Sequence, residues 1–331
     1  MDSFANLSAR ERSQVLEEAA SRQGVHPAIM EKDFWVCWIL MKLFDDASLS
    51  KHLVFKGGTS LSKAHHLIER FSEDVDLVLD WELLGYGRNG IDPWQNKPSN
   101  NQLDRFNKEF NAQADRYIKQ VLVPQIGSAF ASCHSVEIRA SETEPHVVEV
   151  KYPAGFELKA IRPQVKLEIG PLASWVPSAN YSISPYVAEL FPKLFTRAVC
   201  NVTAITAERT FWEKATILHQ QFHRTTTMPS GYSRHYYDMV MLSSSSVKTN
   251  ALGNLQLLRD VVQFKQRFYR SGWARYDLAT PGSFRLVPSD AGKKSLRDDY
   301  IAMRPMFFSE PPSWNKILES LEKLENEINS L

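Results

Sequence analysis

The chain has 331 residues, of which 43% are hydrophobic, and its 39 Lys and Arg residues almost balance its 38 Asp and Glu residues. This length and apolar content suffice for two domains, or for one domain with a substantial extension. The charge balance excludes nucleic-acid binding through a global electrostatic field, so any such binding needs a local patch. Three widely spaced cysteines without a CxxC pattern argue against a disulfide framework or a zinc finger.

The N-terminal segment MDSFANLSARERSQ lacks the apolar core of a signal peptide. The most apolar run, FWVCWILMKLF at residues 34–44, is too short to cross a membrane, so we expect a cytoplasmic protein. Ser8 and Glu11 have the spacing of a capping box at the start of a surface helix. A second helix should begin near Pro27, and its dense apolar residues predict that most of its circumference is buried.

Residues 52–79 are predicted to form a strand, a glycine turn, a helix and a second strand. An apolar run over residues 52–55 leads into the glycine pair, and residues 60–70 have helical character. Residues 74–79 alternate, which places Asp74 and Asp76 on the face opposite three apolar side chains.

The rest of the chain predicts more strands and then helices. Residues 85–101 are rich in Gly, Asn and Pro and should form a long loop before a helix over residues 102–123. Three strand-like runs follow at residues 135–140, 147–152 and 164–169. The pattern turns helical from about residue 204. We therefore predict an α+β fold with a mixed, largely antiparallel sheet, divided into residues 1–203 and a mainly helical domain at 204–331.

Asp74 and Asp76 have the pattern of a metal site. Alternation on a strand brings the two carboxylates close together on one face, where their repulsion is unfavourable. A divalent cation relieves this repulsion, and carboxylate oxygens suit Mg²⁺ or Mn²⁺, which complete their coordination with water and nucleotide phosphate. Taken alone, the pair would be more typical of an ordinary turn or a solvated strand edge than of a metal site.

The turn before this strand has the pattern of an anion site. Gly57 and Gly58 let the backbone approach a bulky anion, and a turn that opens onto a helix offers free amide donors. Thr59 and Ser60 add hydroxyl groups, and Lys63 lies one helical turn beyond Ser60. The GxxxxGK[ST] pattern of a P-loop is absent. These residues predict a triphosphate cradle that faces the metal-binding strand.

The stretch FKGGTSLSKAHHLIERFSEDVDL, preceded by EKDFWVCWIL, resembles the AbiEii/MenT group of nucleotidyltransferase toxins from abortive-infection and toxin–antitoxin systems. This group is a branch of the polymerase-β-like nucleotidyltransferases, whose signature is a glycine turn followed by Asp-x-Asp. The resemblance implies a nucleotidyltransferase core with N-terminal helices in residues 1–203 and a helical C-terminal domain.

Two further segments resemble the same group. ERTFWEKATILH is similar to a block in which a helix supplies a lysine to the active site, which implies this role for Lys214. YSRHYYDMVML is similar to a block that usually reads Arg-Asp-x-Tyr-Asp, which implies site roles for Arg234 and Asp238. His235 stands where that block usually has its first aspartate.

A third carboxylate often completes the metal site of polymerase-β-like enzymes, on a strand beside the Asp-x-Asp strand. Glu168, in the alternating run QVKLEIG, is the first candidate, and Glu149 in VVEVKY is the second. In a two-metal scheme this residue would help to activate the attacking hydroxyl group. For either glutamate, a solvated position on a strand face is the alternative.

A segment near the C-terminal end of the chain interleaves basic and aromatic residues, which would suit a nucleic-acid backbone with stacked bases. The simpler interpretation, an amphipathic helix with core aromatic residues and solvated charges, is the one the sequence favours. The residues are Phe264, Lys265, Arg267, Phe268, Tyr269, Arg270, Trp273, Arg275 and Tyr276.

The resemblance implies a metal-dependent nucleotidyltransferase that moves a nucleoside monophosphate from an NTP to an acceptor hydroxyl group. It further implies that the acceptor is the 3′ end of tRNA, and that the enzyme is the toxin of a type IV toxin–antitoxin system restrained by a separate antitoxin. Two alternatives stay open: the same fold modifies a protein or a small molecule, or the chain is a non-catalytic nucleotide-binding regulatory module.

Overall fold

The computed structural model of the protein describes residues 1–87, 99–158 and 161–331. These residues form two compact units, and the chain passes between them three times. Unit 1 consists of Met1–His65 and Phe71–Ile205, and unit 2 consists of His66–Arg70 and Thr206–Leu331.

The sequence analysis predicted a single division of the chain, between residues 203 and 204. That these two parts are domains that fold independently stays a prediction. The short segment His66–Arg70 in unit 2 was not foreseen. Of the long loop predicted over residues 85–101, residues 88–98 lie outside the described part of the chain.

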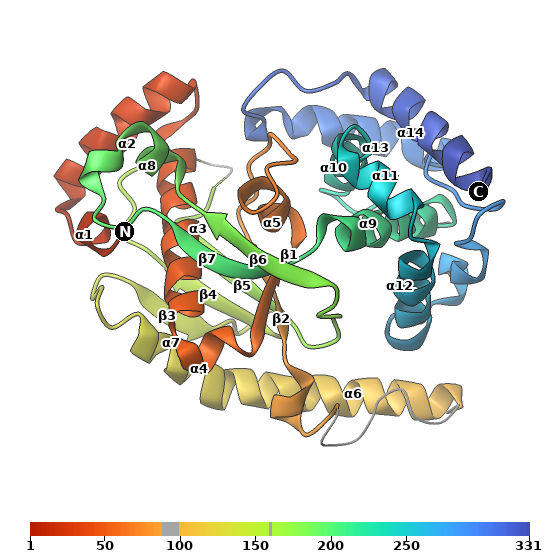
Figure 1. The fold of residues 1–331 in the computed structure, drawn as a ribbon, viewed down its shortest axis with the longest axis horizontal. Coiled ribbons are helices and arrows are strands. Elements are labelled where there is room, and N and C mark those ends of the chain that lie inside the picture. The colour runs from red at the N-terminus through yellow and green to blue at the C-terminus, as the bar shows by residue number, and fades with distance from the viewer. Residues whose placement is uncertain (88–98, 159–160) are drawn as a thin grey trace. The chain divides into compact units, whose positions relative to one another are not determined.

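Unit 1 contains a seven-stranded mixed sheet with the strand order β3-β4-β5-β2-β1-β7-β6 (Figure 1). Two neighbouring pairs, β2 with β5 and β1 with β7, are parallel, and the other four pairs are antiparallel. The predicted α+β fold with a mixed, largely antiparallel sheet is therefore confirmed. The strands are β1 (Leu53–Lys56), β2 (Val75–Leu79), β3 (Glu137–Ala140), β4 (Val147–Lys151), β5 (Gln164–Gly170), β6 (Ser178–Ile183) and β7 (Cys200–Ile205).

Strands β6 and β7 were missed by the sequence analysis. β6 lies at an edge of the sheet and most of its side chains are exposed, so its residues SANYSI show no clear apolar alternation. The burial of side chains in β7 does alternate: Val202 and Ala204 are buried, and Asn201 and Thr203, which precede them, are more exposed. The pattern was present in β7 and was overlooked because the residues just after it are helical.

Helix α3 (Pro27–Asp45) packs against β5 and β7 (Figure 1), and almost its whole circumference is buried, as its composition predicted. Its N-cap region contains the predicted proline, and the predicted capping box at Ser8 and Glu11 is present on α2. The other helices of unit 1 are α1 (Asp2–Ala5), α2 (Ala9–Gln23), α4 (Ala47–Ser50), α5 (Gly57–Lys63), α6 (Asn100–Tyr117), α7 (Val123–Ala129) and α8 (Tyr186–Leu190).

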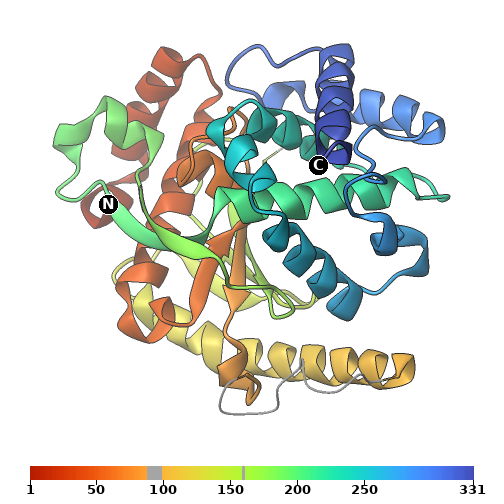
Figure 2. The same ribbon diagram turned by 45° about the vertical axis from the view of Figure 1, so that its right-hand side comes forward.

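Unit 2 is mainly helical. Its first long helix, α9, packs against α10, α11 and α12 (Figure 2), and the buried Trp212 of α9 donates a hydrogen bond to the Ala251 carbonyl over 3.2 Å. The segment His66–Arg70 joins the unit through main-chain contacts, in which the Phe308 amide donates to the Glu69 carbonyl over 3.0 Å. The long helices are α9 (Ala207–Phe222), α10 (Ser233–Ser243), α11 (Ser246–Leu252), α12 (Leu255–Phe268), α13 (Asp290–Ala302) and α14 (Trp314–Asn329).

Two expectations from the sequence concern membrane spans and cysteines. In the described part of the chain, no helix combines the length and the apolar composition that a membrane span requires. Cys37, Cys133 and Cys200 are all buried free thiols, as expected of a chain without a disulfide framework.

Candidate active site

The Asp-x-Asp pattern lies at the start of β2. The strand begins at Val75, so Asp74, which the prediction placed inside the strand, immediately precedes it. Val75 and Leu77 are fully buried, whereas Asp74 and Asp76 are only half-buried. The burial pattern therefore agrees with two carboxylates on the face opposite the apolar side chains.

Gly57 lies directly against the carboxylate of Asp76. A Cβ atom added to Gly57 would stand 1.8 Å from Asp76 Oδ2 and 2.6 Å from its Cγ. The backbone of Gly57 also has a φ of 80°, in the left-handed region that favours glycine. Any side chain at this position would therefore have to displace Asp76.

Both hydroxyl groups of the turn donate hydrogen bonds to main-chain carbonyl groups. Thr59 Oγ1 donates a hydrogen bond to the Asp74 carbonyl, and Ser60 Oγ donates to the Gly57 carbonyl over 2.9 Å. The helix that contains them, α5, spans Gly57–Lys63. The predicted helix over residues 60–70 was wrong at both ends, because the observed helix begins at Gly57 and ends at Lys63. His66 has a φ of 54°, and Arg70 pairs with Phe307 in unit 2.

Lys63 is engaged by α3. Its Nζ lies 2.8 Å from Asp33 Oδ1, both side chains are only 4% exposed, and the ammonium group lies 3.5 Å from the ring centroid of Tyr186. Burial opposes the charged form, but Asp33 outweighs it and raises the pKa of Lys63 above its usual value. This pair anchors α5 to α3, and the predicted contact of Lys63 with a phosphate stays a prediction.

Asp74 lies among several charges. Burial raises the pKa of Asp74 to about 6, and the neighbouring Glu73 and Asp76 carboxylates act in the same direction, against Lys32 and Lys166. Lys32 of α3 is almost fully buried, with its Nζ 2.6 Å from Glu73 Oε2. Crowded carboxylate oxygens of this kind fit a hard divalent cation. Mg²⁺, for example, is typically bound by one or two protein carboxylates.

Of the two candidates for a third carboxylate, Glu168 is the one aligned with the pair. The parallel register of β2 and β5 places Glu168 opposite Asp76, and its side chain is exposed. Glu149, on β4, pairs with Arg139 at 2.7 Å. Among the residues that the structure describes, no group of three or more His, Cys, Asp and Glu side chains is arranged to hold a metal ion. The residues present thus fit a two-carboxylate site, and the role of Glu168 stays a prediction.

Unit 2 contains a buried ion cluster of Arg70, Lys214 and Asp238. Arg70 Nε and Nη2 each lie 2.7 Å from an oxygen of Asp238, and Lys214 Nζ lies 2.7 Å from Asp238 Oδ2. Burial opposes the ionised form of Asp238, but the two cations outweigh it and hold the pKa of this carboxyl group well below its usual range. Because two cations share one carboxylate, the cluster has one positive charge in excess.

His235 leaves this excess of charge unchanged. Its Nδ1 lies 3.5 Å from Lys214 Nζ, and burial together with the Lys214 and Arg234 cations lowers the pKa of His235 well below its usual value. The imidazole is therefore neutral near pH 7, where an aspartate at this position would be negative. Arg234 on the same helix turn is exposed.

The model of the AbiEii family, described as the nucleotidyl transferase AbiEii toxin of type IV toxin–antitoxin systems, matches residues 38–321. The chain belongs to the AbiEii family. It is accordingly a nucleotidyltransferase, of a family whose members are toxins of type IV toxin–antitoxin systems, with an NTP as substrate and an antitoxin as partner.

Comparisons with individual proteins give less information than the family model. No curated protein matches this AbiEii chain. Among solved structures it is similar to MenT4, a nucleotidyltransferase toxin of Mycobacterium tuberculosis H37Rv, with 14% sequence identity, 98% of each chain covered and a TM-score of 0.43.

The predicted site residues of the AbiEii chain all lie within the matched residues 38–321, and they form two groups. The glycine turn, Asp74, Asp76 and Glu168 belong to unit 1, and Lys214, Arg234 and Asp238 belong to unit 2. Two charged residues were missed: Lys32, whose partner Glu73 is 41 residues away, and Arg70, whose partner Asp238 is 168 residues away. The only signal in the sequence was their position inside the two segments that resemble the family.

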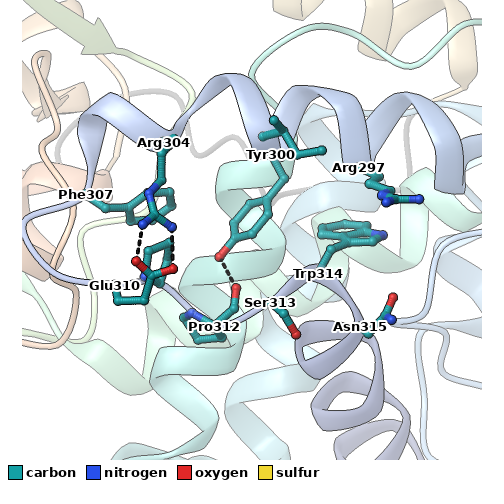
Figure 3. A pocket seen from close by; sticks show the side chains of 11 residues that line it. Arg297, Tyr300, Arg304, Phe307, Glu310, Pro312, Ser313, Trp314 and Asn315 are labelled. Atoms are coloured by element: carbon teal, nitrogen blue, oxygen red, sulfur yellow. Dashed lines mark hydrogen bonds and ion pairs between the residues drawn. The ribbon is translucent and has the colours of Figure 1, made fainter.

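The AbiEii chain also has a pocket of about 480 Å³ in unit 2, lined by none of the predicted site residues (Figure 3). Tyr300 and Trp314 contribute aromatic rings, and the Tyr300 hydroxyl donates to the Pro312 carbonyl over 2.8 Å. The Phe307 ring on the pocket wall packs against Tyr237, with the ring centroids 4.9 Å apart. The pocket thus borders the helix turn that carries Asp238.

Gly57→Ala is expected to lower the rate of nucleotidyl transfer by about 100-fold, since displacing a reacting group by roughly an ångström has an effect of this size. The reason is the space that Asp76 occupies at Gly57. The rate is measured with labelled NTP, and a thermal unfolding curve shows whether the chain is folded. Gly127→Ala in α7 is the matched control, because a Cβ there meets nothing within 4 Å. Equal rates for both variants would contradict the proposed role of Gly57.

Proposed function

We propose that this enzyme transfers a nucleoside monophosphate from an NTP to the 3′-hydroxyl group of a tRNA, with a divalent cation, Mg²⁺ or Mn²⁺, held by Asp74 and Asp76. The observation that supports this most directly is the crowded pair of half-buried carboxylates at the start of β2, packed against a glycine that cannot be replaced without displacing one of them. Unit 1 would accordingly have a polymerase-β-like core.

Asp74 and Asp76 would hold the cation, which would supply positive charge to phosphate oxygens and to the pyrophosphate leaving group. Asp74 must be ionised to act as a ligand, and its raised pKa of about 6 still leaves it mostly ionised at pH 7. Gly57 and Gly58 give the triphosphate access to the main chain, while Thr59 bonds to the Asp74 carbonyl just before β2 and Ser60 bonds to the Gly57 carbonyl within the turn. Glu168, opposite Asp76 in the sheet register, accepts the proton of the attacking hydroxyl group.

In unit 2, we propose that Lys214 and Arg234 interact with phosphate groups. The cluster around Lys214 has one positive charge in excess, which a phosphate oxygen would neutralise. Asp238 is the positioning residue of this cluster, since its carboxylate binds both Arg70 and Lys214. The acceptor tRNA and the NTP are both present in the cytoplasm, where we propose that the toxin acts and where its separately encoded antitoxin restrains it.

The test is to incubate the protein with each of the four α-labelled NTPs, with Mg²⁺ or Mn²⁺, and with either total tRNA or total protein as acceptor. We expect label in the tRNA fraction from one preferred NTP, and no label after chelation of the metal. Label in the protein fraction alone would show that the acceptor is a protein. Label that persists without metal would contradict the role of Asp74 and Asp76.

A further inference from the structure

The segment at the end of α12 that interleaves aromatic and basic residues is divided by the structure into core and surface. Phe264, Phe268 and Tyr276 are buried, with exposed fractions of 8%, 4% and 6%, as the amphipathic-helix interpretation predicted. Tyr269 and Trp273 are instead 49% and 38% exposed. Among the described residues, they are the only aromatic side chains in the set of exposed large hydrophobic residues.

One arginine lies over the Trp273 ring, and another lies between the two aromatic residues in the sequence. The Arg224 guanidinium carbon lies 4.6 Å from the centroid of the Trp273 ring, and Arg270 is exposed between Tyr269 and Trp273 in the sequence. The nearest acidic residue in the sequence, Asp277, is occupied by Arg275 at 2.9 Å. We refer to Arg224, Tyr269, Arg270 and Trp273 as the aromatic–arginine surface, and its charge is positive.

The segment that carries this surface is fixed to α9. Tyr276 donates its hydroxyl hydrogen to Gln220 Oε1 over 2.7 Å, and His219 Nε2 donates to the Arg275 carbonyl over 2.9 Å. Arg224 is itself held by Gln221, whose Oε1 lies 2.6 Å from its Nε. A ligand would therefore meet an Arg224 guanidinium group that is already in place beside the Trp273 ring, which reduces the entropy lost on binding.

Exposed aromatic rings next to arginines are the feature by which proteins bind single-stranded nucleic acid, because every base has a face that stacks on a ring and every phosphate attracts a guanidinium group. An acidic peptide would need the arginines but would not explain the exposed rings. Charge and ring chemistry together favour an unpaired stretch of RNA.

We propose that the aromatic–arginine surface binds unpaired nucleotides of the acceptor RNA, with bases on Tyr269 and Trp273 and phosphates at Arg224 and Arg270. This rests on the proposed function, in which the acceptor is an RNA. The same helix, α9, carries Lys214, and at a rise of about 1.5 Å per residue its C-terminal end at Phe222 lies about 12 Å further along the helix axis. The surface is thus distinct from Lys214, to which the proposed function assigns a phosphate group.

The test compares steady-state kinetics of Tyr269→Ala and Trp273→Ala with the wild type, with the RNA that the wild type labels as acceptor. We expect each variant to raise the KM for RNA about tenfold or more, with the KM for NTP and the kcat at saturating RNA almost unchanged. Tyr269→Phe and Trp273→Phe keep a ring that stacks, so the KM for RNA should return close to the wild-type value. Arg270→Ala should weaken the dependence of RNA binding on salt.

The matched control is Arg259→Ala, an exposed arginine on the same helix α12 whose guanidinium group bonds only to Gln256 among the described residues. It should leave the KM for RNA unchanged. If the Tyr269→Ala/Trp273→Ala double variant kept the wild-type KM for RNA, the surface assignment would be wrong while the proposed function stood. If the wild type labelled protein and not RNA, both the acceptor assignment and this inference would fail.

Discussion

Asp76→Asn is expected to lower the rate of nucleotidyl transfer by about 1,000-fold or more, because a catalytic metal ion contributes several kcal/mol of transition-state stabilisation and about 1.4 kcal/mol corresponds to a factor of ten. The amide has the shape of the carboxylate, so the strand and its contact with Gly57 should remain. What the variant loses is the negative charge that holds the cation. The rate is measured in a single turnover with labelled NTP at saturating metal.

Two further variants serve as a control for this experiment and as a test of the third carboxylate. Asp104→Asn removes a carboxylate from an exposed position on α6 and should leave the rate unchanged. Glu168→Gln tests the third carboxylate, because its position opposite Asp76 predicts a loss of rate if it takes the proton of the acceptor hydroxyl group. An Asp76→Asn variant with more than half of the wild-type rate would contradict the metal assignment, whatever the result for Glu168.

Asp238→Asn is expected to lower the free energy of unfolding by about 3–5 kcal/mol, since removing one partner of a buried ion pair leaves uncompensated charge in the interior. Here two cations, Arg70 and Lys214, would lose their common carboxylate. The free energy is measured by urea unfolding followed by circular dichroism.

The pH dependence of this difference has a definite sign. The pKa of Asp238 is lowered on folding, so its contribution is fully present above the usual pKa of an aspartate, about 3.9, and is lost as the pH falls below it. The wild type and the variant should therefore converge in acid. Equal stability of the two at pH 7 would show that the cluster does not stabilise unit 2.

Asp45→Asn is the matched control for stability. Its carboxylate pairs with Arg197 at 2.6 Å, but the two side chains are 38% and 53% exposed. Exposed pairs contribute about 0–1 kcal/mol, so this substitution should have a small effect. The comparison separates the cost of a buried charge from the general effect of removing an aspartate.

The carboxylate strand could be predicted because everything that defines it is local. The glycine turn, the alternation of Asp74 and Asp76 and the apolar residues between them lie within about twenty residues, and strand periodicity alone places both carboxylates on one face. The positions of β1, β3, β4 and β5 were predicted within one or two residues for the same reason.

Other features could not be predicted because they depend on residues far apart in the chain. Nothing near Arg70 indicates a partner at Asp238, and nothing near Lys63 indicates that α3 would supply Asp33. The helical pattern of residues 64–70 is real, but main-chain pairing with residues 307 and 308 overrides it. The histidine at position 235 was visible in the sequence, and only the structure shows that its Nδ1 lies 3.5 Å from Lys214 Nζ.

The short segment His66–Arg70 has a consequence for how this toxin can be inherited. It belongs to unit 2 although unit 1 residues flank it on both sides in the gene. A fragment that begins at residue 206 would lack Arg70, so Asp238 would keep only Lys214, and the main chain at Phe307 and Phe308 would lose its pairing. The coding sequences for residues 66–70 and 206–331 must therefore be inherited together for this ion cluster to form.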